Sequence, residues 1–241
     1  DIRKAFKANN DNLIVSFDYS QVELRILAHY SQEKKLIDSF KNNLDIHSKT
    51  ASLIYGINID DVMYNHRRVA KIINYSIAYG AGPFRISQEL KIPIKEASNI
   101  ISNYFDRYPG IRKYIDDTIK EGFENGYVAT ILGRQRNTYN LRSTNRNLQE
   151  AEKRATINMP IQGTASELIK VAMVNIYNKL KKMKFESKMI LQIHDELLFE
   201  SPQNEKENLI KMVVKEMESA IKLDVPIKVD YNFGSNWYEA H

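Results

Sequence analysis

Strand-like and helix-like segments are unevenly distributed along this chain of 241 residues. Short apolar runs rich in branched residues are typical of buried strands, and they occur mainly near the two ends, at 13–17, 188–193, 197–200 and 227–231. Most of the intervening sequence has helical periodicity. We therefore expect an α+β fold, in which the two ends build one sheet with its helices and a mostly helical subdomain is inserted between them.

Local signals mark several of these elements. Asp45 is a helix N-cap residue and Gly56 a helix-ending residue, so they delimit one helix. Pro160 should break a long helical region, because proline cannot continue the hydrogen-bond ladder. A strand at 127–131 precedes a basic turn at 133–136. The expected helices lie at 21–29, 45–54, 66–80, 93–107, 110–125, 144–182 (with the break) and 204–222.

Composition excludes several classes of protein. The chain has no cysteine, which rules out disulfides and thiolate metal sites and fits a cytosolic compartment. No apolar run approaches membrane-spanning length, and no signal-peptide pattern opens the chain. The net charge of +5 is only a weak indication of nucleic-acid binding. Because the first residue is Asp rather than Met, we expect the chain to be a fragment of a longer protein.

A stripe of side chains runs along the helix expected at 66–80. Arg67, Lys71, Tyr75 and Tyr79 are spaced by fours, and each step of four advances only about 40° around a helix. Two cations followed by two aromatic rings could grip phosphate at one end and stack a base or sugar at the other. Taken alone, the cations could be a solvated face and the tyrosines core residues.

Two acidic positions could hold metal ions. Asp18 follows the strand at 13–17, and Asp195 lies at the turn of a hairpin at 188–200. Carboxylates on neighbouring strand ends can hold two hard cations about 3.5–4 Å apart, and Mg²⁺ prefers few carboxylates plus substrate phosphates. Each Asp by itself is better explained as a cap or turn residue. Together with the cationic stripe, they favour metal binding.

Three further polar residues do not indicate a function by themselves. His47, taken alone, is best explained as a solvated surface histidine. Asn158 and Gln162 flank the expected helix break, where their amides could read acceptors in a DNA minor groove or could cap the break.

Three segments together resemble motifs A, B and C of the family A DNA polymerases, the bacterial polymerase I type. DYSQVELR at 18–25 resembles motif A, RRVAKIINYSIAYG at 67–80 motif B, and QIHDELLFE at 192–200 motif C. The resemblance spans essentially the whole chain. Further similar segments are DIHSKTA at 45–51, LGRQR at 132–136, NMPIQGTASELIK at 158–170 and the ending VPIKVDYNFGSNWYEAH.

The resemblance implies a particular domain organisation. Residues 1–30, with motif A, and 149–241, with the motif C hairpin at 188–200, would form a polymerase palm with an antiparallel sheet and helices. Residues 31–148, with the motif B helix at 66–80, would form the inserted fingers. The thumb is absent, which predicts a weak grip on DNA and an unpaired sheet edge.

The resemblance also implies template-directed DNA synthesis, in which a primer 3′-hydroxyl attacks the α-phosphate of a dNTP and pyrophosphate leaves. Asp18 and Asp195 would hold two Mg²⁺ ions, for which Mn²⁺ can substitute, and Glu196 would be a nearby auxiliary acid. Lys71 would bind the inner end of the triphosphate and act as a general acid.

The remaining roles that the resemblance implies concern the nucleotide and the DNA. Arg67 and His47 would hold the outer phosphates, Tyr75 would pack on the sugar and base, and Glu23 would exclude a ribose 2′-hydroxyl. The implied dNTP-binding set is Arg67, Lys71, Tyr75, His47, Glu23 and Gln21. The implied DNA-binding set is Tyr79, Arg154, Asn158, Gln162 and His194.

The implied partners are primer–template DNA and dNTPs, with no membrane. We expect a monomer that is weakly active alone, located in a bacterial-type cytoplasm or an organelle of bacterial descent. Tyr75, where the family has Phe or Tyr, predicts ready use of dideoxynucleotides. Ser76 stands where bacterial members usually have Gly.

Two alternatives remain open. A single-subunit RNA polymerase shares the palm and a Tyr-Gly helix, but a ribose-excluding Glu23 argues against it. A non-catalytic DNA-binding remnant needs no metal carboxylates, so the joint presence of Asp18, Asp195, Arg67 and Lys71 argues against that interpretation.

Overall fold

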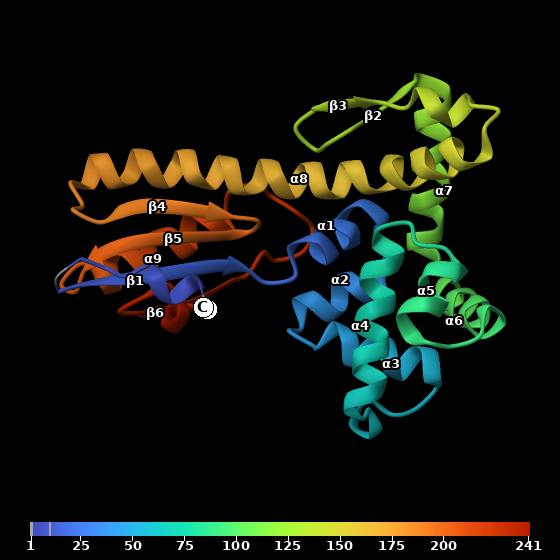
Figure 1. Ribbon diagram of the computed structural model, residues 1–241, viewed down its shortest axis with the longest axis horizontal. Helices are drawn as coiled ribbons and strands as arrows, with labels where there is room; N and C mark the ends of the chain where they lie inside the picture. Colours follow the sequence, from blue (N-terminus) through green and yellow to red (C-terminus); the bar gives the residue numbers. More distant parts are fainter. Residues whose placement is uncertain (1, 10) are drawn as a thin grey trace. The chain divides into compact units, whose positions relative to one another are not determined.

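The computed structural model describes residues 2–9 and 11–241, and its chain divides into two compact units (Figure 1). Unit 1 comprises Asp1–Val22 and Ala165–His241, and unit 2 comprises Glu23–Thr164. Helix α8, Arg146–Met183, contributes its first part to unit 2 and its second part to unit 1. The division into a palm (1–30 and 149–241) and fingers (31–148) stays a prediction.

Unit 1 is built on a four-stranded antiparallel sheet. Its strands are β1 (Asn12–Tyr19), β4 (Lys188–Ile193), β5 (Glu196–Pro202) and β6 (Val229–Gly234). Their order is β4-β5-β1-β6, which places a strand from the beginning of the chain between strands from its end. The expected mixture of helices with an antiparallel sheet is confirmed, and β4 and β6 are the outer strands of the described sheet.

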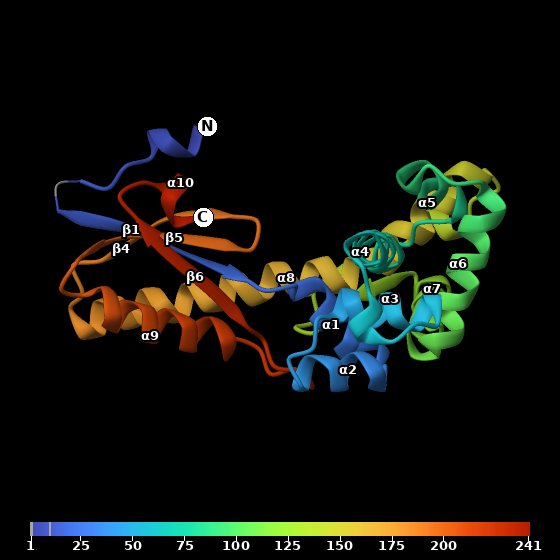
Figure 2. The same ribbon diagram turned by 90° about the horizontal axis from the view of Figure 1, so that it is seen from below.

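The core of unit 1 lies on the two central strands and the helices beside them. Phe17 of β1 and Phe199 of β5 are fully buried and meet edge to face, with ring centroids 5.4 Å apart. Helix α9 (Lys206–Glu218) and the second part of α8 lie on one side of the sheet in Figure 2, and α10 (Trp237–Ala240) lies on the other. Burial of both faces explains why β1 and β5 are near-continuous apolar runs.

Unit 2 is mostly helical. Helix α3 packs against α4, and α5 packs against α6. A short hairpin, β2–β3, follows α7. The elements of unit 2, apart from the first part of α8, are α1 (Val22–Ser31, from Glu23), α2 (Lys34–Lys41), α3 (Ile46–Tyr55), η2 (Ile59–Asp61), α4 (Tyr64–Ala78), α5 (Pro83–Leu90), α6 (Ile94–Arg107), α7 (Pro109–Asn125), β2 (Tyr127–Ala129), β3 (Gln135–Asn137) and η3 (Tyr139–Arg142).

The expected break at Pro160 is wrong, because α8 is continuous through it. A proline removes one backbone hydrogen-bond donor and crowds the carbonyl group four residues earlier. Tertiary packing of the residues before and after Pro160 compensates for this cost, and the helix continues. Pro160 is itself buried, and Ile157 and Ile161 beside it are buried too. Asn158 and Gln162 therefore lie on a continuous helix and do not cap a break.

Among the described residues, no helix combines the length and the apolar character that crossing a membrane requires.

Candidate functional site

The fold of unit 1 brings two separate acidic positions together. Asp18 lies opposite Glu196 in the register of β1 and β5. The turn that precedes β5 contains Asp195, whose carbonyl oxygen accepts a hydrogen bond of 3.3 Å from the backbone N–H of Tyr19. Asp18 is the penultimate residue of β1, so the strand extends further than the expected end at residue 17. Pairing of the strands is the reason that Asp18 and Asp195 are neighbours.

The carboxyl group of Asp18 has an unfavourable environment for its negative charge. Burial, followed by the charges of Asp195 and Glu196, raises its pKa to about 6. Its Oδ1 atom is buried and has no hydrogen-bond partner within the described residues. A bound cation would neutralise this charge and satisfy this oxygen, so the residues present fit a hard, oxygen-binding metal ion.

Glu196 is already engaged by neighbouring donors. It is buried, and its Oε1 accepts hydrogen bonds from Ser16 Oγ at 2.6 Å and Trp237 Nε1 at 2.9 Å. His241 Nδ1 lies 3.4 Å from the same oxygen. Sequence reasoning missed all three of these contacts, since nothing in the spacing of these residues indicates that they meet.

Among the described residues, no group of three or more His, Cys, Asp and Glu side chains forms a ready metal site. Two carboxylates are therefore the protein ligands to be considered, and phosphate oxygens and water would have to complete the coordination. Mg²⁺ is commonly held in this way, by one or two carboxylates plus substrate phosphates.

Two predicted site residues beside these acids have unusual backbone conformations. Gln21 and His194 adopt left-handed conformations, with φ of 53° and 54°. Residues other than glycine rarely do so, and the strain is often found at functional sites. Both residues lie in unit 1, close in sequence to Asp18 and Asp195 respectively.

In unit 2, the predicted stripe lies along the less buried side of α4. Lys71 is exposed, and Arg67, Tyr75 and the C-cap residue Tyr79 are half-buried. The buried residues of the helix lie between these positions: Ala70, Ile73, Asn74, Ser76, Ile77 and Ala78. The alternative that the stripe tyrosines are ordinary core residues is therefore wrong.

Arg67 is held by a residue that sequence reasoning treated only as a cap. Its Nε atom lies 2.5 Å from Oδ2 of Asp45, which also caps α3 by accepting from the backbone N–H of His47. Burial by itself would raise the pKa of Asp45, but the hydrogen bonds from Arg67, Ser48 and the His47 backbone outweigh it, so the pKa lies below its usual value. Asp45 thus orients Arg67.

His47 is buried, with only 2% of its surface exposed, so the interpretation of it as a surface histidine is wrong. Its Nδ1 lies 3.1 Å from Asn74 Nδ2, and its ring centroid lies 5.9 Å from that of Tyr75. Burial, with smaller effects of Arg67 and Lys71, lowers its pKa to about 4, against an opposing effect of Asp45. His47 is consequently neutral near pH 7.

A second cluster forms where α4 ends. The Tyr79 hydroxyl donates a hydrogen bond to the Glu23 carboxylate, and Gln162 also hydrogen-bonds Tyr79. Burial, and then Glu23, raises the pKa of Tyr79 well above its usual value. The next residue, Gly80, has φ of 68°, and a Cβ there would lie 3.2 Å from Ile157 Cδ1 and 3.4 Å from the Arg154 Cα.

This close approach brings the predicted DNA-binding residues Tyr79, Gln162 and Arg154 into one region of unit 2. Asn158 lies on the same stretch of α8, and its Oδ1 is buried with no hydrogen-bond partner within the described residues. Of the other predicted residues, Arg67, Lys71, His47 and Tyr75 lie around α3 and α4 of the same unit.

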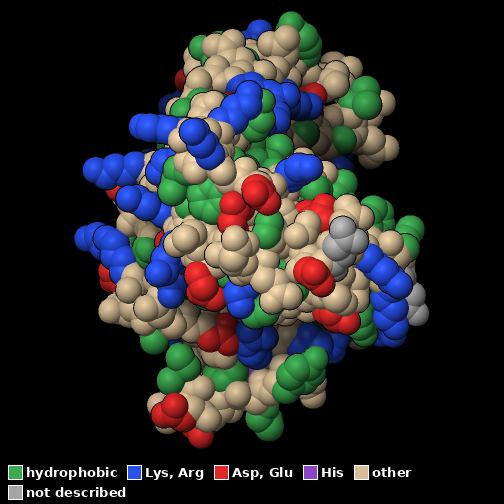
Figure 3. All heavy atoms as spheres, turned by 90° about the vertical axis from the view of Figure 1, so that its left-hand side faces the viewer, with side chains coloured by type: hydrophobic (Ala, Val, Ile, Leu, Met, Phe, Trp, Pro, Cys, Tyr) green, Lys and Arg blue, Asp and Glu red, His purple; other side chains and the backbone are tan. Residues whose placement is uncertain are grey.

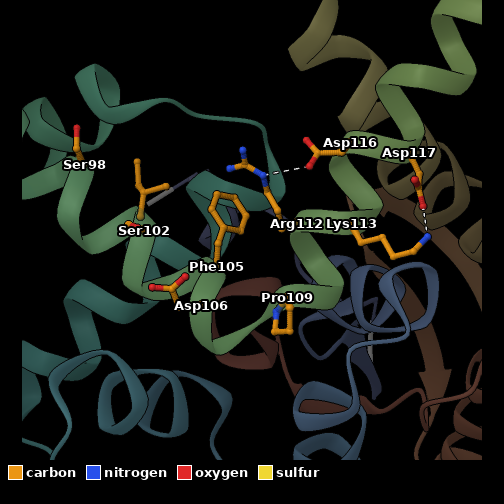
Figure 4. Close-up of a pocket in the computed structure, with 10 residues that line it drawn as sticks. Ser98, Ser102, Phe105, Asp106, Pro109, Arg112, Lys113, Asp116 and Asp117 are labelled. Atoms are coloured by element: carbon orange, nitrogen blue, oxygen red, sulfur yellow. Dashed lines mark hydrogen bonds and ion pairs between the residues drawn. The ribbon is translucent and has the colours of Figure 1, made fainter.

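Two clefts within the described residues, one in each unit, are lined by other residues. A cleft of about 730 Å³ between α6 and α7 is lined by paired charges, Arg112 with Asp116 and Lys113 with Asp117 (Figure 4). In unit 1, a groove between α8 and α9 is lined by Lys179, Lys211, Lys215, Met183 and other residues. Lys and Arg side chains gather along the left side of the view in Figure 3.

Comparisons with known proteins agree on one family. A family model described as DNA polymerase family A matches residues 1–239. The chain is 45% identical over 238 residues to DNA polymerase I of Caldicellulosiruptor bescii and 43% identical over 240 residues to that of Bacillus subtilis. Each match covers 99% of this chain but only 28% and 27% of those relatives, so the chain spans little more than a quarter of their length.

A solved structure gives the same result for the fold. The POL domain of Pol1 from M. smegmatis, in complex with DNA primer–template and dNTP, matches with a TM-score of 0.96 and 40% sequence identity. The match covers 99% of this chain and 42% of that chain.

Proposed function

Because this chain belongs to DNA polymerase family A, we propose that it carries the catalytic centre for template-directed DNA synthesis. The reaction adds a dNTP to a primer 3′-hydroxyl and releases pyrophosphate. The observation that carries the proposal is the proximity of Asp18 and Asp195 in unit 1, where Oδ1 of Asp18 is buried with no hydrogen-bond partner among the described residues and the pKa of Asp18 is raised.

Asp18 and Asp195 are the proposed ligands of two Mg²⁺ ions. Bound there, Mg²⁺ would supply the positive charge that stabilises the attacking and leaving oxygens in phosphoryl transfer. In this arrangement, hydrogen bonds from Ser16 and Trp237 hold the Glu196 carboxylate in place, and its negative charge acts on Asp18. That charge increases the attraction of the pair for cations.

Residues of α3 and α4 are the proposed triphosphate-binding group. Arg67 is pre-oriented by Asp45, and neutral His47 can donate one hydrogen bond to an outer phosphate. Lys71 is exposed on the same stripe, where it can bind the inner end of the triphosphate and donate a proton to the leaving pyrophosphate. Tyr75 packs on the incoming sugar and base. Gln21, near Asp18 in sequence, is a further proposed nucleotide contact.

Glu23 and Tyr79 are the proposed sugar gate and template-stacking residue. The hydrogen bond from the Tyr79 hydroxyl keeps the Glu23 carboxylate in place, so that it can exclude a 2′-hydroxyl sterically. Gln162, Arg154 and Asn158 of α8, with His194 of the β4–β5 turn, are the proposed contacts to primer–template DNA.

The remaining expectations complete the proposal. The proposed palm comprises residues 1–30 and 149–241 and the proposed fingers residues 31–148, whereas units 1 and 2 divide between residues 22 and 23 and between residues 164 and 165. The partners are primer–template DNA and dNTPs, the chain acts as a monomer, and its compartment is the cytoplasm or an organelle of bacterial descent.

Single-nucleotide incorporation tests this function against its alternatives. Four primed templates, each offering a different template base, are supplied with one dNTP or one rNTP at a time and with Mg²⁺. We expect only the complementary dNTP to be added, and Glu23→Ala to admit the matching rNTP. Exposed Glu207→Gln on α9 is the matched control and should not change the selection.

Two other outcomes would contradict the proposal. Preferential addition of rNTPs by the unmodified chain would indicate an RNA polymerase. Binding of the primed templates without any incorporation would indicate a non-catalytic DNA-binding protein.

A further inference from the structure

A chain of buried polar side chains connects three parts of unit 2. His47 and Thr50 of α3, Asn74 of α4 and Tyr108 between α6 and α7 are each at most 2% exposed. Asn74 Nδ2 lies 3.1 Å from His47 Nδ1 and 3.2 Å from Thr50 Oγ1, and Thr50 Oγ1 lies 3.0 Å from the Tyr108 hydroxyl. Burial of polar groups is costly unless they are hydrogen-bonded, and this network supplies the bonds.

The partner of His47 determines where its ring carries a proton. An amide nitrogen has donors and no acceptor, so the Nδ1 atom that faces Asn74 Nδ2 must accept. A neutral imidazole with an accepting Nδ1 carries its proton on Nε2. The contact with Asn74 therefore selects one of the two tautomers.

The surroundings of His47 favour this neutral form. Asp45, at the N-cap of α3, is paired with Arg67, and Lys71 and the ring of Tyr75 face His47 from α4. Burial and the two cations lower the pKa of His47 to about 4, which keeps a second proton off the ring near neutral pH. The positive charge on this surface thus comes from Arg67 and Lys71, while His47 contributes a directed donor.

We propose that Asn74 is a positioning residue that fixes His47 as the Nε2–H tautomer, so that the neutral ring donates one hydrogen bond to a phosphate oxygen of the bound nucleotide. The phosphate contact rests on the proposed function, whereas the tautomer does not. Thr50 Oγ1 lies 3.2 Å from Asn74 Nδ2 and 3.3 Å from Asn74 Oδ1, and the Tyr108 hydroxyl lies 3.0 Å from Thr50 Oγ1, so the network restrains the Asn74 side chain within the core.

Nuclear magnetic resonance of the ring nitrogens tests the tautomer directly in the nucleotide-free protein. We expect His47 to show a protonated Nε2 and an unprotonated Nδ1 near pH 7. A carboxylate in place of the amide accepts from Nδ1–H, so Asn74→Asp should move the proton to Nδ1 and raise the pKa of the ring. Asn65→Asp, at an exposed position of the same helix, should change neither.

Steady-state kinetics tests the proposed hydrogen bond between His47 and a phosphate oxygen of the nucleotide. The KM for dNTP of the unmodified chain should stay nearly constant between about pH 6 and pH 8. In Asn74→Asp the KM should rise about tenfold over that range, because the ring loses its Nε2 proton as it becomes neutral, and a hydrogen bond to a charged group is lost. The kcat should change much less than the KM.

Each outcome has a separate meaning. A proton on Nδ1 in the unmodified chain would overturn the proposal even if Asn74→Asp failed to fold. An unaltered tautomer in a folded Asn74→Asp variant would overturn it as well. A correct tautomer combined with a normal dNTP KM for His47→Phe would refute the phosphate contact, without bearing on whether Asp18 and Asp195 support DNA synthesis.

Discussion

At the scale of single residues, burial changes what the titratable groups of this chain can do. Asp18 and His47 are shifted in the direction that disfavours their charged forms, to pKa values of about 6 and about 4. A bound cation would offset this cost for Asp18, whereas His47 avoids it by losing its proton. The same physical cause would therefore favour metal binding at the proposed ligand Asp18 and neutral hydrogen bonding at His47.

Asp18→Asn should stabilise unit 1 at high pH. Because the pKa of Asp18 is raised from 3.8 to about 6, its contribution to stability is present below the lower value and is lost as the pH rises through the higher one. With allowance for solvent screening of this partly buried group, the gain at about pH 8 is about 1–2 kcal/mol. Thermal melts at about pH 8 and pH 4 measure it.

Addition of Mg²⁺ provides the control for the stability change in Asp18→Asn. Mg²⁺ should raise the melting temperature of the unmodified chain more than that of Asp18→Asn, since only the former has both carboxylates. A stabilisation by Asp18→Asn that is as large at about pH 4 as at pH 8 would refute the electrostatic explanation.

At the scale of secondary-structure elements, a side chain contact ties α4 to α5. Ser76 on α4 is buried, and its hydroxyl donates a hydrogen bond of 3.0 Å to Glu89 Oε2 on α5. Arg85 of α5 holds the other oxygen of Glu89 at 3.0 Å. Ser76 directly follows Tyr75, so this contact fixes the part of α4 that carries a proposed nucleotide contact.

A double-mutant cycle measures the contribution of the Ser76–Glu89 hydrogen bond to stability. Ser76→Ala should cost about 1 kcal/mol of unfolding free energy, a typical value for one hydrogen bond. The cost should be much smaller when Glu89→Ala is already present. Ser102→Ala, exposed on α6, is the matched control and should be nearly neutral. Strictly additive effects of Ser76→Ala and Glu89→Ala would show that the contact contributes nothing in solution.

Some elements could be predicted from the sequence because their signals are local. Asp45 and Gly56 cap α3 as expected, and the four-residue stripe identified α4. Helices α2 and α5 were missed, since each has only eight residues and periodicity is weak over two turns. The effect of Pro160 was misjudged because the packing around α8 is a property of the folded unit.

The candidate site was predictable in its residue types but not in its contacts. The motifs identified Asp18, Asp195, Arg67 and Lys71, and strand pairing in unit 1 makes the first two neighbours. The Asp45–Arg67 pair, the buried His47–Asn74 contact and the Glu196–Trp237 hydrogen bond depend on tertiary packing. Sequence spacing contains no information on such long-range pairs.

At the scale of the whole molecule, one unit is assembled from the two ends of the chain. The segments Asp1–Val22 and Ala165–His241 build unit 1, which contains both candidate metal ligands. Most of the proposed nucleotide-binding residues lie in unit 2. We infer that this chain supplies both groups of a polymerase catalytic centre, although it spans little more than a quarter of the length of the relatives named above.

Primer extension with Mg²⁺ and dNTPs, comparing the unmodified chain with Asp195→Asn, tests whether this chain contains both groups. We expect extension by the unmodified chain and a loss of about a hundredfold or more in Asp195→Asn, because the charge of a bound metal would stabilise the transition state by several kcal/mol. Asp38→Asn, exposed on α2, is the matched control and should extend normally. Extension that survives in Asp195→Asn, or no extension by the unmodified chain, would contradict the claim.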